Sequence, residues 1–288
     1  MRILILGGDG MLGHRLLRDF ASRHEVRVTL RQDADAYGKH RLFSRENSSF
    51  GIDARYSERL LEVVSQFRPE AIVNCVGIVK QRDEAKAALP SIEINALLPH
   101  RLALLARTLG ARLVHFGTDC VFSGRRGNYS ESDPSDAEDL YGRSKYLGEV
   151  GGEGCLTLRT SIIGLELSRK AGLLEWFLAQ RGKSISGYRR AIYTGFTTAE
   201  MARILERLLT DYPVASGVYH VSSEPISKYD LLSRLNEACA LGVRIEPEQS
   251  FFCDRSLDSG RFRAQFHYSP PAWDAMIAEL AAEIRVTR

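Results

Sequence analysis

A glycine-rich turn directly after a short apolar run is the feature that most constrains the fold of this chain. Residues 2–6 read RILIL, and the next seven residues, GGDGMLG, place Gly7, Gly10 and Gly13 three apart. The apolar run is typical of a buried parallel strand, and MLGHRLLRDFASR after it has the spacing of an amphipathic helix. A strand, a glycine-rich turn and a helix in this order predict a dinucleotide-binding loop.

Each glycine of this loop has a separate physical task. The first permits a tight turn, the second lets the backbone approach a pyrophosphate, and the third lets the helix pack on the strand. The start of the helix adds free N–H groups and the positive end of its dipole. We therefore expect Gly7, Gly10, Met11, Leu12 and Gly13 to contact the cofactor. A tight turn that binds nothing is the alternative.

Strand-like and helix-like segments alternate beyond this turn, which predicts an α/β fold: a Rossmann-type doubly wound parallel sheet with a smaller C-terminal α/β substrate lobe. The predicted segments are strands at 25–30, 71–77, 112–118 and 217–223, helices at 57–69, 95–110, 172–183, 197–213 and 227–242, and a long polar loop at 31–50, and the alternation becomes less regular after 155–164. We expect a dinucleotide-binding domain at 1–160, a mainly substrate-binding lobe at 161–288, and segments near 188–222 that return to the first domain.

The end of the second predicted strand bears on the choice of cofactor. An acidic residue there would bind a ribose 2′-hydroxyl and favour NAD. The segment VRVTLRQ has none and offers Arg31, whose guanidinium suits a 2′-phosphate. We therefore expect NADP(H) rather than NAD(H). A solvated surface arginine is the alternative for Arg31.

A tyrosine and a lysine stand four residues apart in DLYGRSKYLGEV, residues 139–150, and are neighbours if this segment is helical. A cofactor that carries hydride needs a proton donor for the substrate oxygen, and tyrosine, with a pKa of ~10, needs its anion stabilised to serve at neutral pH. Lys145 could stabilise Tyr141 in this way, and the hydroxyl of Thr118 at the end of a predicted strand could hold the substrate oxygen. A chance surface pair is the alternative.

These motifs resemble those of extended short-chain dehydrogenases/reductases, most closely the dTDP-4-dehydrorhamnose reductase branch. GTDCVFSG is similar to that branch's S-T-D-Y-V-F-x-G, YGRSKYLGE to its Y-G-x-[ST]-K-x-x-G-E, and LRTSIIG and SKYDLL to two further segments. The resemblance, which runs from residue 1 to about residue 265, implies an NADPH-dependent reductase of a nucleotide-linked 4-keto deoxysugar. The cysteines, which fit small buried residues in a reducing compartment, lead us to expect a cytoplasmic protein. It makes Thr118, Tyr141 and Lys145 the catalytic residues.

The resemblance also implies roles that the spacing alone does not assign. Cys75, Val76 and Gly77 would line the cofactor trough. Asp53 would sit at the adenine pocket, and Asp119 near the substrate. For Asp53, a cap on the next helix is the alternative.

Several departures from the family pattern bear on the substrate. Cys120 and Ile162 replace aromatic residues, the loop 31–50 is longer than usual, and NCVGIVKQR replaces an alanine-rich run and brings Lys80 near the site. They leave the particular sugar open. Arg159, Arg189 and Arg190 are candidates for the diphosphate of the substrate, because arginine binds phosphate oxygens in bidentate fashion; surface arginines are the alternative.

Two other functions compete with the reductase. An epimerase or dehydratase acting on a nucleotide sugar would recycle its hydride on tightly held NAD, so NADPH consumption would separate the two. A non-catalytic regulatory subunit would use the fold as a binding platform, and such proteins tend to lose the tyrosine or the lysine, both of which are present here.

Composition excludes several other classes. A net charge of +3 is too small to indicate nucleic-acid binding, and no segment reaches the ~20 apolar residues of a membrane span. The N-terminus lacks the features of a secretory signal. Five cysteines without a C-x-x-C pair, and seven histidines without H-x-x-x-H spacing, indicate neither a disulfide framework nor a metal site. The expected partner is a nucleotide sugar, and a homodimer is left open.

Overall fold

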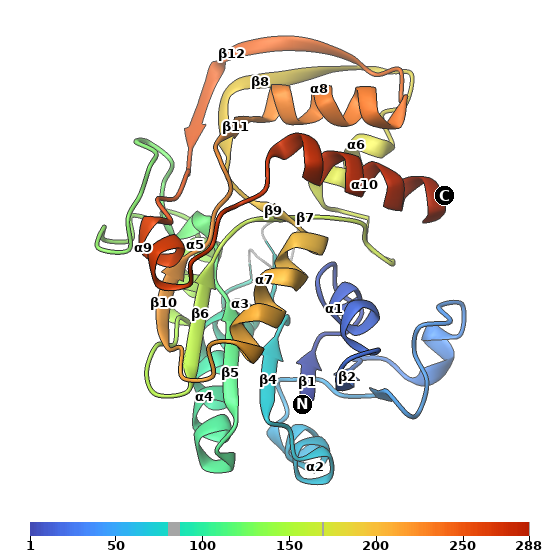
Figure 1. Cartoon of the computed structure of the whole chain (residues 1–288), viewed down its shortest axis with the longest axis vertical. Helices are drawn as coiled ribbons and strands as arrows, with labels where there is room; N and C mark the ends of the chain where they lie inside the picture. Colours follow the sequence, from blue (N-terminus) through green and yellow to red (C-terminus); the bar gives the residue numbers. More distant parts are fainter. Residues whose placement is uncertain (80–86, 169, 288) are drawn as a thin grey trace. The chain divides into compact units, whose positions relative to one another are not determined.

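The computed structural model describes residues 1–79, 87–168 and 170–287. The chain forms two compact units (Figure 1). The first unit consists of Met1–Gly117, Asp139–Leu158 and Ala202–Val218, and the second of Thr118–Glu138, Arg159–Met201 and Tyr219–Arg288. The domain boundary at residue 160 and the functions assigned to the two sides stay predictions.

The central element of the first unit is a seven-stranded sheet, whose strands lie in the order β10-β6-β5-β4-β1-β2-β3. Its strands are β1 (Arg2–Leu6), β2 (Glu25–Thr29), β3 (Ser48–Ser49), β4 (Ala71–Asn74), β5 (Arg112–Phe116), β6 (Cys155–Arg159) and β10 (Gly217–His220). Every pairing from β3 through to β6 is parallel. The strand order reverses between β1 and β4, which makes the sheet doubly wound and confirms the predicted α/β class.

Helices follow the strands as the sequence predicts. In chain order they are α1 (Gly13–Phe20), the 3₁₀ turn η1 (Ala34–Tyr37), α2 (Ser57–Phe67), α3 (Ala88–Ser91), the π-helical turn η3 (Ile92–Leu97), α4 (Leu98–Leu109), α5 (Leu140–Leu147) and α7 (Thr198–Thr210). Helix α2 shows why they form: Leu60, Val63, Val64 and Phe67 recur at helical spacing and are all buried. They join a core with β1, β4 and α4, and each such side chain contributes roughly 1.5–3 kcal/mol by leaving water.

A smaller sheet lies in the second unit, in the order β11-β8-β12. The elements of this unit are η4 (Asp119–Val121), β7 (Ile162–Ile163), α6 (Leu173–Leu178), β8 (Ser184–Tyr193), β9 (Phe196–Thr197), β11 (Ile226–Ser227), α8 (Lys228–Cys239), β12 (Arg244–Asp254), α9 (Gly260–Gln265) and α10 (Trp273–Thr287). Strands β7 and β9 form a separate parallel pair. Helix α8 begins after Ser227, whose Oγ accepts a hydrogen bond from the Asp230 N–H at 3.0 Å.

Two sequence predictions need correction. The stretch 31–50 is not one irregular loop, because it contains η1 and β3. The helix predicted from Asn95 begins as a π-helical turn and becomes α-helical only at Leu98. Each of these elements is short or irregular, so it lacks the regular apolar spacing by which a sequence indicates a strand or a helix.

Candidate functional site

The glycine loop has a backbone that other residues could not adopt. Gly7 has φ of +80°, in the left-handed region that glycine enters freely. A Cβ on Gly13 would lie 2.1 Å from the carbonyl oxygen of Gly7, so this glycine allows α1 to start directly against the loop. Gly8, which the sequence analysis did not single out, is equally constrained, since its Cβ would lie 2.5 Å from the Cβ of Val28 on β2.

The first turn of α1 fits an anionic group. Leu12 stands at the N-cap, no side chain caps the helix, and no acidic residue occurs in its first turn. The positive dipole end is therefore left for a ligand, although the His14 N–H already donates to the Gly10 carbonyl at 3.2 Å. The loop stays close to β2 through the bond from the Gly8 N–H to the Thr29 carbonyl at 3.0 Å. The residues present fit the pyrophosphate of a dinucleotide.

Arg31 and Asp53 come together beyond β2. The Ile52 N–H donates to the Leu30 carbonyl at 2.9 Å, which places the segment carrying Asp53 beside the segment carrying Arg31. Hydrogen bonds from Arg55 lower the pKa of the Asp53 carboxyl, and Arg31 adds a smaller favourable charge. Asp53 does not cap α2, whose N-cap is Tyr56, so the capping alternative is wrong. Arg55, which the sequence analysis missed, pairs with Asp53 at 2.6 Å.

Tyr141 and Lys145 lie on α5, which begins after Asp139, whose Oδ1 accepts from the Gly142 N–H at 2.8 Å. Tyr141 is half-buried and Lys145 is only 6% exposed. The Nζ of Lys145 donates to the Phe116 carbonyl at 2.6 Å. Burial lowers the pKa of Lys145 to about 8. Lys145 is therefore not a surface residue, and the surface-pair alternative is excluded. Burial of an ammonium group is costly unless hydrogen bonds stabilise it, and the Phe116 carbonyl provides one.

A chain of buried polar groups reaches Lys145 from the sheet. Its Nζ lies 3.3 Å from Nε2 of His115 on β5, and Nδ1 of that ring lies 3.1 Å from Nδ2 of Asn74 on β4. The Val76 N–H then donates to Oδ1 of Asn74 at 3.1 Å. Sequence analysis missed both side chains. Their signal was a polar residue near the end of each of two adjacent apolar strands, and the register pairs them directly.

Asn95 ties this segment to α5 from the π-helical turn η3. Its Nδ2 donates to the Ile78 carbonyl at 3.0 Å and to Ser144 Oγ at 3.3 Å, and its Oδ1 accepts from the Ile78 N–H at 2.9 Å. Gly148 allows the close approach of α5, since its Cβ would lie 1.9 Å from the Asn95 carbonyl oxygen. These bonds fix the backbone that follows Cys75, Val76 and Gly77, the predicted trough residues, which are all half-buried.

Thr118, Asp119 and Cys120 open the second unit, directly after the end of the β5 segment in the chain. Thr118 Oγ1 accepts from the Cys120 N–H at 3.2 Å, and Ser161 Oγ donates to Asp119 at 2.6 Å. Burial and the Asp119 charge raise the pKa of the Cys120 thiol to about 12, so this thiol stays protonated at neutral pH. The roles predicted for these three residues stay predictions.

The predicted arginines occupy different environments. Arg159 is buried, with Nη1 3.0 Å from Nε2 of His220 and its guanidinium over the Phe122 ring. Arg189 and Arg190 are exposed on β8, where they lie over the rings of Tyr229 and Phe252. Their predicted binding to a diphosphate remains untested. Lys80 lies outside the described residues.

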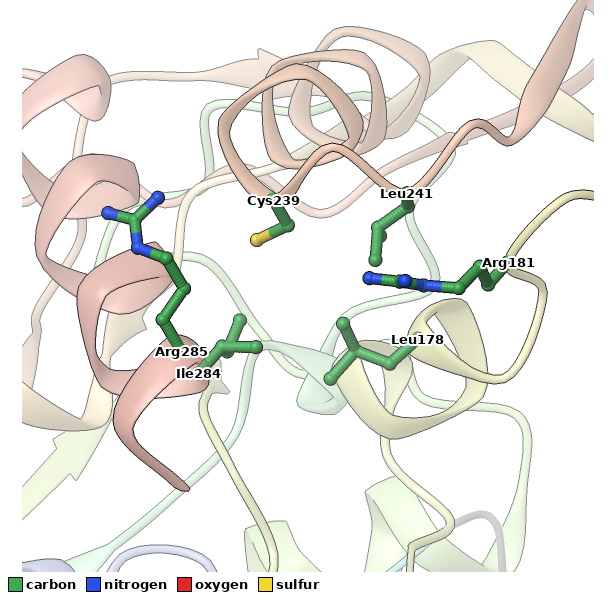
Figure 2. Close-up of a pocket in the computed structure, with 6 residues that line it drawn as sticks. All are labelled: Leu178, Arg181, Cys239, Leu241, Ile284 and Arg285. Atoms are coloured by element: carbon green, nitrogen blue, oxygen red, sulfur yellow. The ribbon is translucent and has the colours of Figure 1, made fainter. Parts of the chain in front are cut away.

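A cavity of about 410 Å³ in the second unit contains none of the predicted site residues (Figure 2). It is lined by Leu178, Arg181, Cys239, Leu241, Ile284 and Arg285. All five cysteines are free. Among the described residues, no group of three or more His, Cys, Asp and Glu side chains could hold a metal ion. Over the same part of the chain, no helix has the length and apolar character needed to cross a bilayer.

Comparisons with known proteins give the chain its relatives. It is 26% identical over 239 residues to a dTDP-4-dehydrorhamnose reductase of Burkholderia thailandensis, which covers 77% of this chain and 73% of the relative. It is also 26% identical over 260 residues to methionine adenosyltransferase 2 subunit beta of Danio rerio, covering 82% and 73%. A structure of Bacillus anthracis dTDP-4-dehydrorhamnose reductase in complex with NADP superposes with a TM-score of 0.79 at 20% identity, covering 98% and 99%.

The structural likeness at that identity shows the fold alone. The family model described as RmlD substrate binding domain, in contrast, matches residues 1–286, nearly the whole chain. That match confirms the resemblance carried by the glycine loop and by the segment around Tyr141 and Lys145. The chain belongs to the RmlD substrate binding domain family.

Proposed function

We propose that this protein is an NADPH-dependent reductase that converts the 4-keto group of a nucleotide-linked deoxysugar to an alcohol. The observation that carries the proposal is the burial of Lys145 on the helix that also presents Tyr141. A lysine without a function in the site would be expected at the surface, not buried with its ammonium group hydrogen-bonded to Phe116 on β5.

NADPH, when bound, would supply the hydride for this reduction. The glycine loop and the first turn of α1 would hold its pyrophosphate, and Cys75, Val76 and Gly77 would line its trough. Arg31 with Arg55 would hold the 2′-phosphate, because their guanidinium groups attract a dianion and also stabilise the charge of the neighbouring Asp53 carboxylate. The choice of NADP over NAD is supported by the absence of an acidic residue at the end of β2 and by the NADP bound to the Bacillus anthracis relative.

Tyr141 would donate its phenolic proton to the substrate oxygen as hydride reaches the carbonyl carbon, so that ketone, hydride and proton together give the alcohol. The Lys145 ammonium would stabilise the phenolate that remains. At ~4 Å and an effective dielectric of ~20, this attraction is about 4 kcal/mol before desolvation. Thr118 would hold the substrate oxygen, an assignment that rests on the motif resemblance alone.

Substrate binding would fall to the second unit. Asp119 and Cys120 are assigned near the sugar, and Arg159, Arg189 and Arg190 near the diphosphate, with Lys80 as a further contact. Arg189 and Arg190 suit this role better than Arg159, because Arg159 is already enclosed beside His220.

The test is NADPH oxidation by the purified protein with a panel of 4-keto nucleotide sugars, with Tyr141→Phe as the matched control. We expect turnover with at least one sugar and loss of most of it in the variant. Substrate conversion without NADPH consumption would instead identify an epimerase or dehydratase.

A regulatory subunit is the second candidate, favoured by the likeness to methionine adenosyltransferase 2 subunit beta. It would bind NADPH and turn over no sugar in the panel. The Tyr141→Phe variant would then behave like the wild type in both NADPH binding and NADPH oxidation. The retention of Thr118, Tyr141 and Lys145 favours the enzyme.

A further inference from the structure

Asn74, His115 and Lys145 form a buried chain of polar side chains. The donors and acceptors of this chain can be matched in some protonation states of its members and not in others. Asn74 and His115 are each 1% exposed, and Lys145 is 6% exposed. Buried polar groups of this kind are almost always hydrogen-bonded, so each proton in the chain has to be placed between a donor and an acceptor.

The orientation of Asn74 follows from its backbone partner. Its Oδ1 accepts from the Val76 N–H at 3.1 Å. Turning the amide over would set its NH₂ group against that N–H, which places two donors face to face. The NH₂ group therefore points to Nδ1 of His115, 3.1 Å away.

The tautomer of His115 follows from Asn74. Because Nδ1 accepts a hydrogen bond, the proton of the neutral ring is on Nε2. The ring is neutral because burial and the nearby Lys145 charge hold the pKa of His115 well below its usual value. The Nε2–H then faces Nζ of Lys145 at 3.3 Å.

An ammonium group has three donors and no acceptor, whereas a neutral amine has a lone pair. The Nε2–H of His115 can therefore bond only to the neutral form of Lys145, and it opposes the charged form. We infer that His115 is a positioning residue that lowers the proton affinity of Lys145. Asn74 makes this possible, because its hydrogen bond to Nδ1 keeps the ring proton on Nε2, facing the amine. The inference rests on the proposed function for the role of Lys145.

Other groups around Lys145 act in the opposite direction, among them the Phe116 carbonyl that accepts from Nζ. Glu149, two residues beyond the end of α5, favours the charged form, and so to a smaller extent does Cys75, directly after β4, whose thiol pKa is raised by burial. Tyr141 shares the helix. His100 on α4 acts on His115 and further disfavours its protonation. His115 is thus the neighbour whose bonded hydrogen discriminates directly between the two forms of the amine.

The test is the pH titration of Lys145 in protein labelled with ¹³C at the lysine Cε, without cofactor or substrate. The resonance of Lys145 is assigned by its loss in Lys145→Met. His115→Gln replaces the ring with an amide that can turn its oxygen toward the ammonium. We expect the midpoint of Lys145 to rise by about one pH unit or more, a roughly tenfold gain in proton affinity. His24→Gln, the same change at a histidine beside Glu206 on α7, is the control and should leave the midpoint unchanged.

A second measurement keeps the inference testable if His115→Gln does not fold. The ¹⁵N shifts of His115 in the wild-type protein report its tautomer, and we expect the Nε2–H form. In Asn74→Asp the carboxylate would draw the proton to Nδ1. An Nδ1–H or charged ring in the wild type, or an unmoved Lys145 midpoint in folded His115→Gln, would overturn the inference. Neither measurement needs turnover, so the result stands apart from that of the sugar panel.

Discussion

Lys145 on α5 and the arginine pair on β8 represent two ways of placing a cation. Lys145 is enclosed, and a hydrogen bond to the Phe116 carbonyl and contact with His115 fix its position. Arg189 and Arg190 are exposed and lie over the rings of Tyr229 and Phe252. A cation held by directional bonds has one position, whereas a cation resting on an aromatic ring can shift at little cost. This difference fits a fixed proton-transfer group and an adaptable binding surface.

Glycines extend the contrast. Gly13 and Gly148 in the first unit each face a backbone oxygen that a Cβ would strike, so the loop and α5 permit no other residue without movement. On β8, Gly187 meets the side chains of Ile245 and Tyr229 instead. Backbone cannot yield as a side chain does, and the glycine loop and the end of α5 are therefore more rigidly specified than β8 at Gly187.

Lys145→Met should have the largest effect. The change removes the charge opposite Tyr141. If Lys145 also bonds the nicotinamide ribose, as the family resemblance implies, a charge-assisted hydrogen bond worth roughly 1.5–3 kcal/mol is lost as well, so NADPH affinity should fall by about one to two orders of magnitude. Turnover should fall further, since the proton step suffers separately. Titration of cofactor binding together with steady-state kinetics measures both. Wild-type affinity with an unmoved pH profile would remove Lys145 from the site.

The same variant carries a pH signature in stability. Burial lowers the pKa of Lys145 from 10.5 to about 8, so between these values the unfolded chain binds a proton that the folded protein does not. The free energy of unfolding should therefore rise from pH 8 to 10.5 in the wild type relative to Lys145→Met. Urea denaturation across that range measures the difference.

Gly13→Ala should come next. The new methyl group would meet the Gly7 carbonyl oxygen, and overpacking against backbone costs typically ~1–3 kcal/mol. We expect that loss in the free energy of unfolding together with weaker NADPH binding. Gly152→Ala is the matched control, because a Cβ there meets nothing within 4 Å. Equal stability of the two variants would mean that the loop relaxes around the new methyl group and is not rigid.

The sequence predicted the fold class, the family and the pairing of Tyr141 with Lys145. The glycine spacing, the alternation of elements and the i, i+4 pair of Tyr141 and Lys145 are local patterns, and they predicted the α/β class and the family. The contacts of His115 and Asn74 could not be read in the same way, because they depend on the register between β4 and β5. Strand β8 was missed because only Gly187 and Ala191 along it are buried, which leaves no alternating apolar pattern.

Arg31→Ala should weaken NADPH far more than NADH, because only the former carries the 2′-phosphate. Arg31 is exposed, so part of its charge is screened, and we expect a loss of about tenfold for NADPH, near the lower end of ~1.5–3 kcal/mol for a charged hydrogen bond. Arg55→Ala provides a comparison, since it also frees Asp53 to repel the phosphate. Comparable weakening of both cofactors by Arg31→Ala would indicate a packing role, and NADH would then be the cofactor to test.

Arg189→Ala should have the smallest effect and tests the adaptable half of the comparison. The arginine lies 4.1 Å from the centre of the Tyr229 ring, and an exposed cation–π contact contributes only ~0.5–1 kcal/mol, so stability should hardly change. If Arg189 contacts the diphosphate, the KM for the nucleotide sugar should rise several-fold while kcat and NADPH affinity stay constant. Arg190→Ala, over Phe252 on the same strand, is the matched partner. Because both cations can shift, either one should partly replace the other, and the double variant should lose more than the two single losses combined. Strict additivity, or a fall in kcat, would show that β8 holds its cations as rigidly as the sheet holds Lys145.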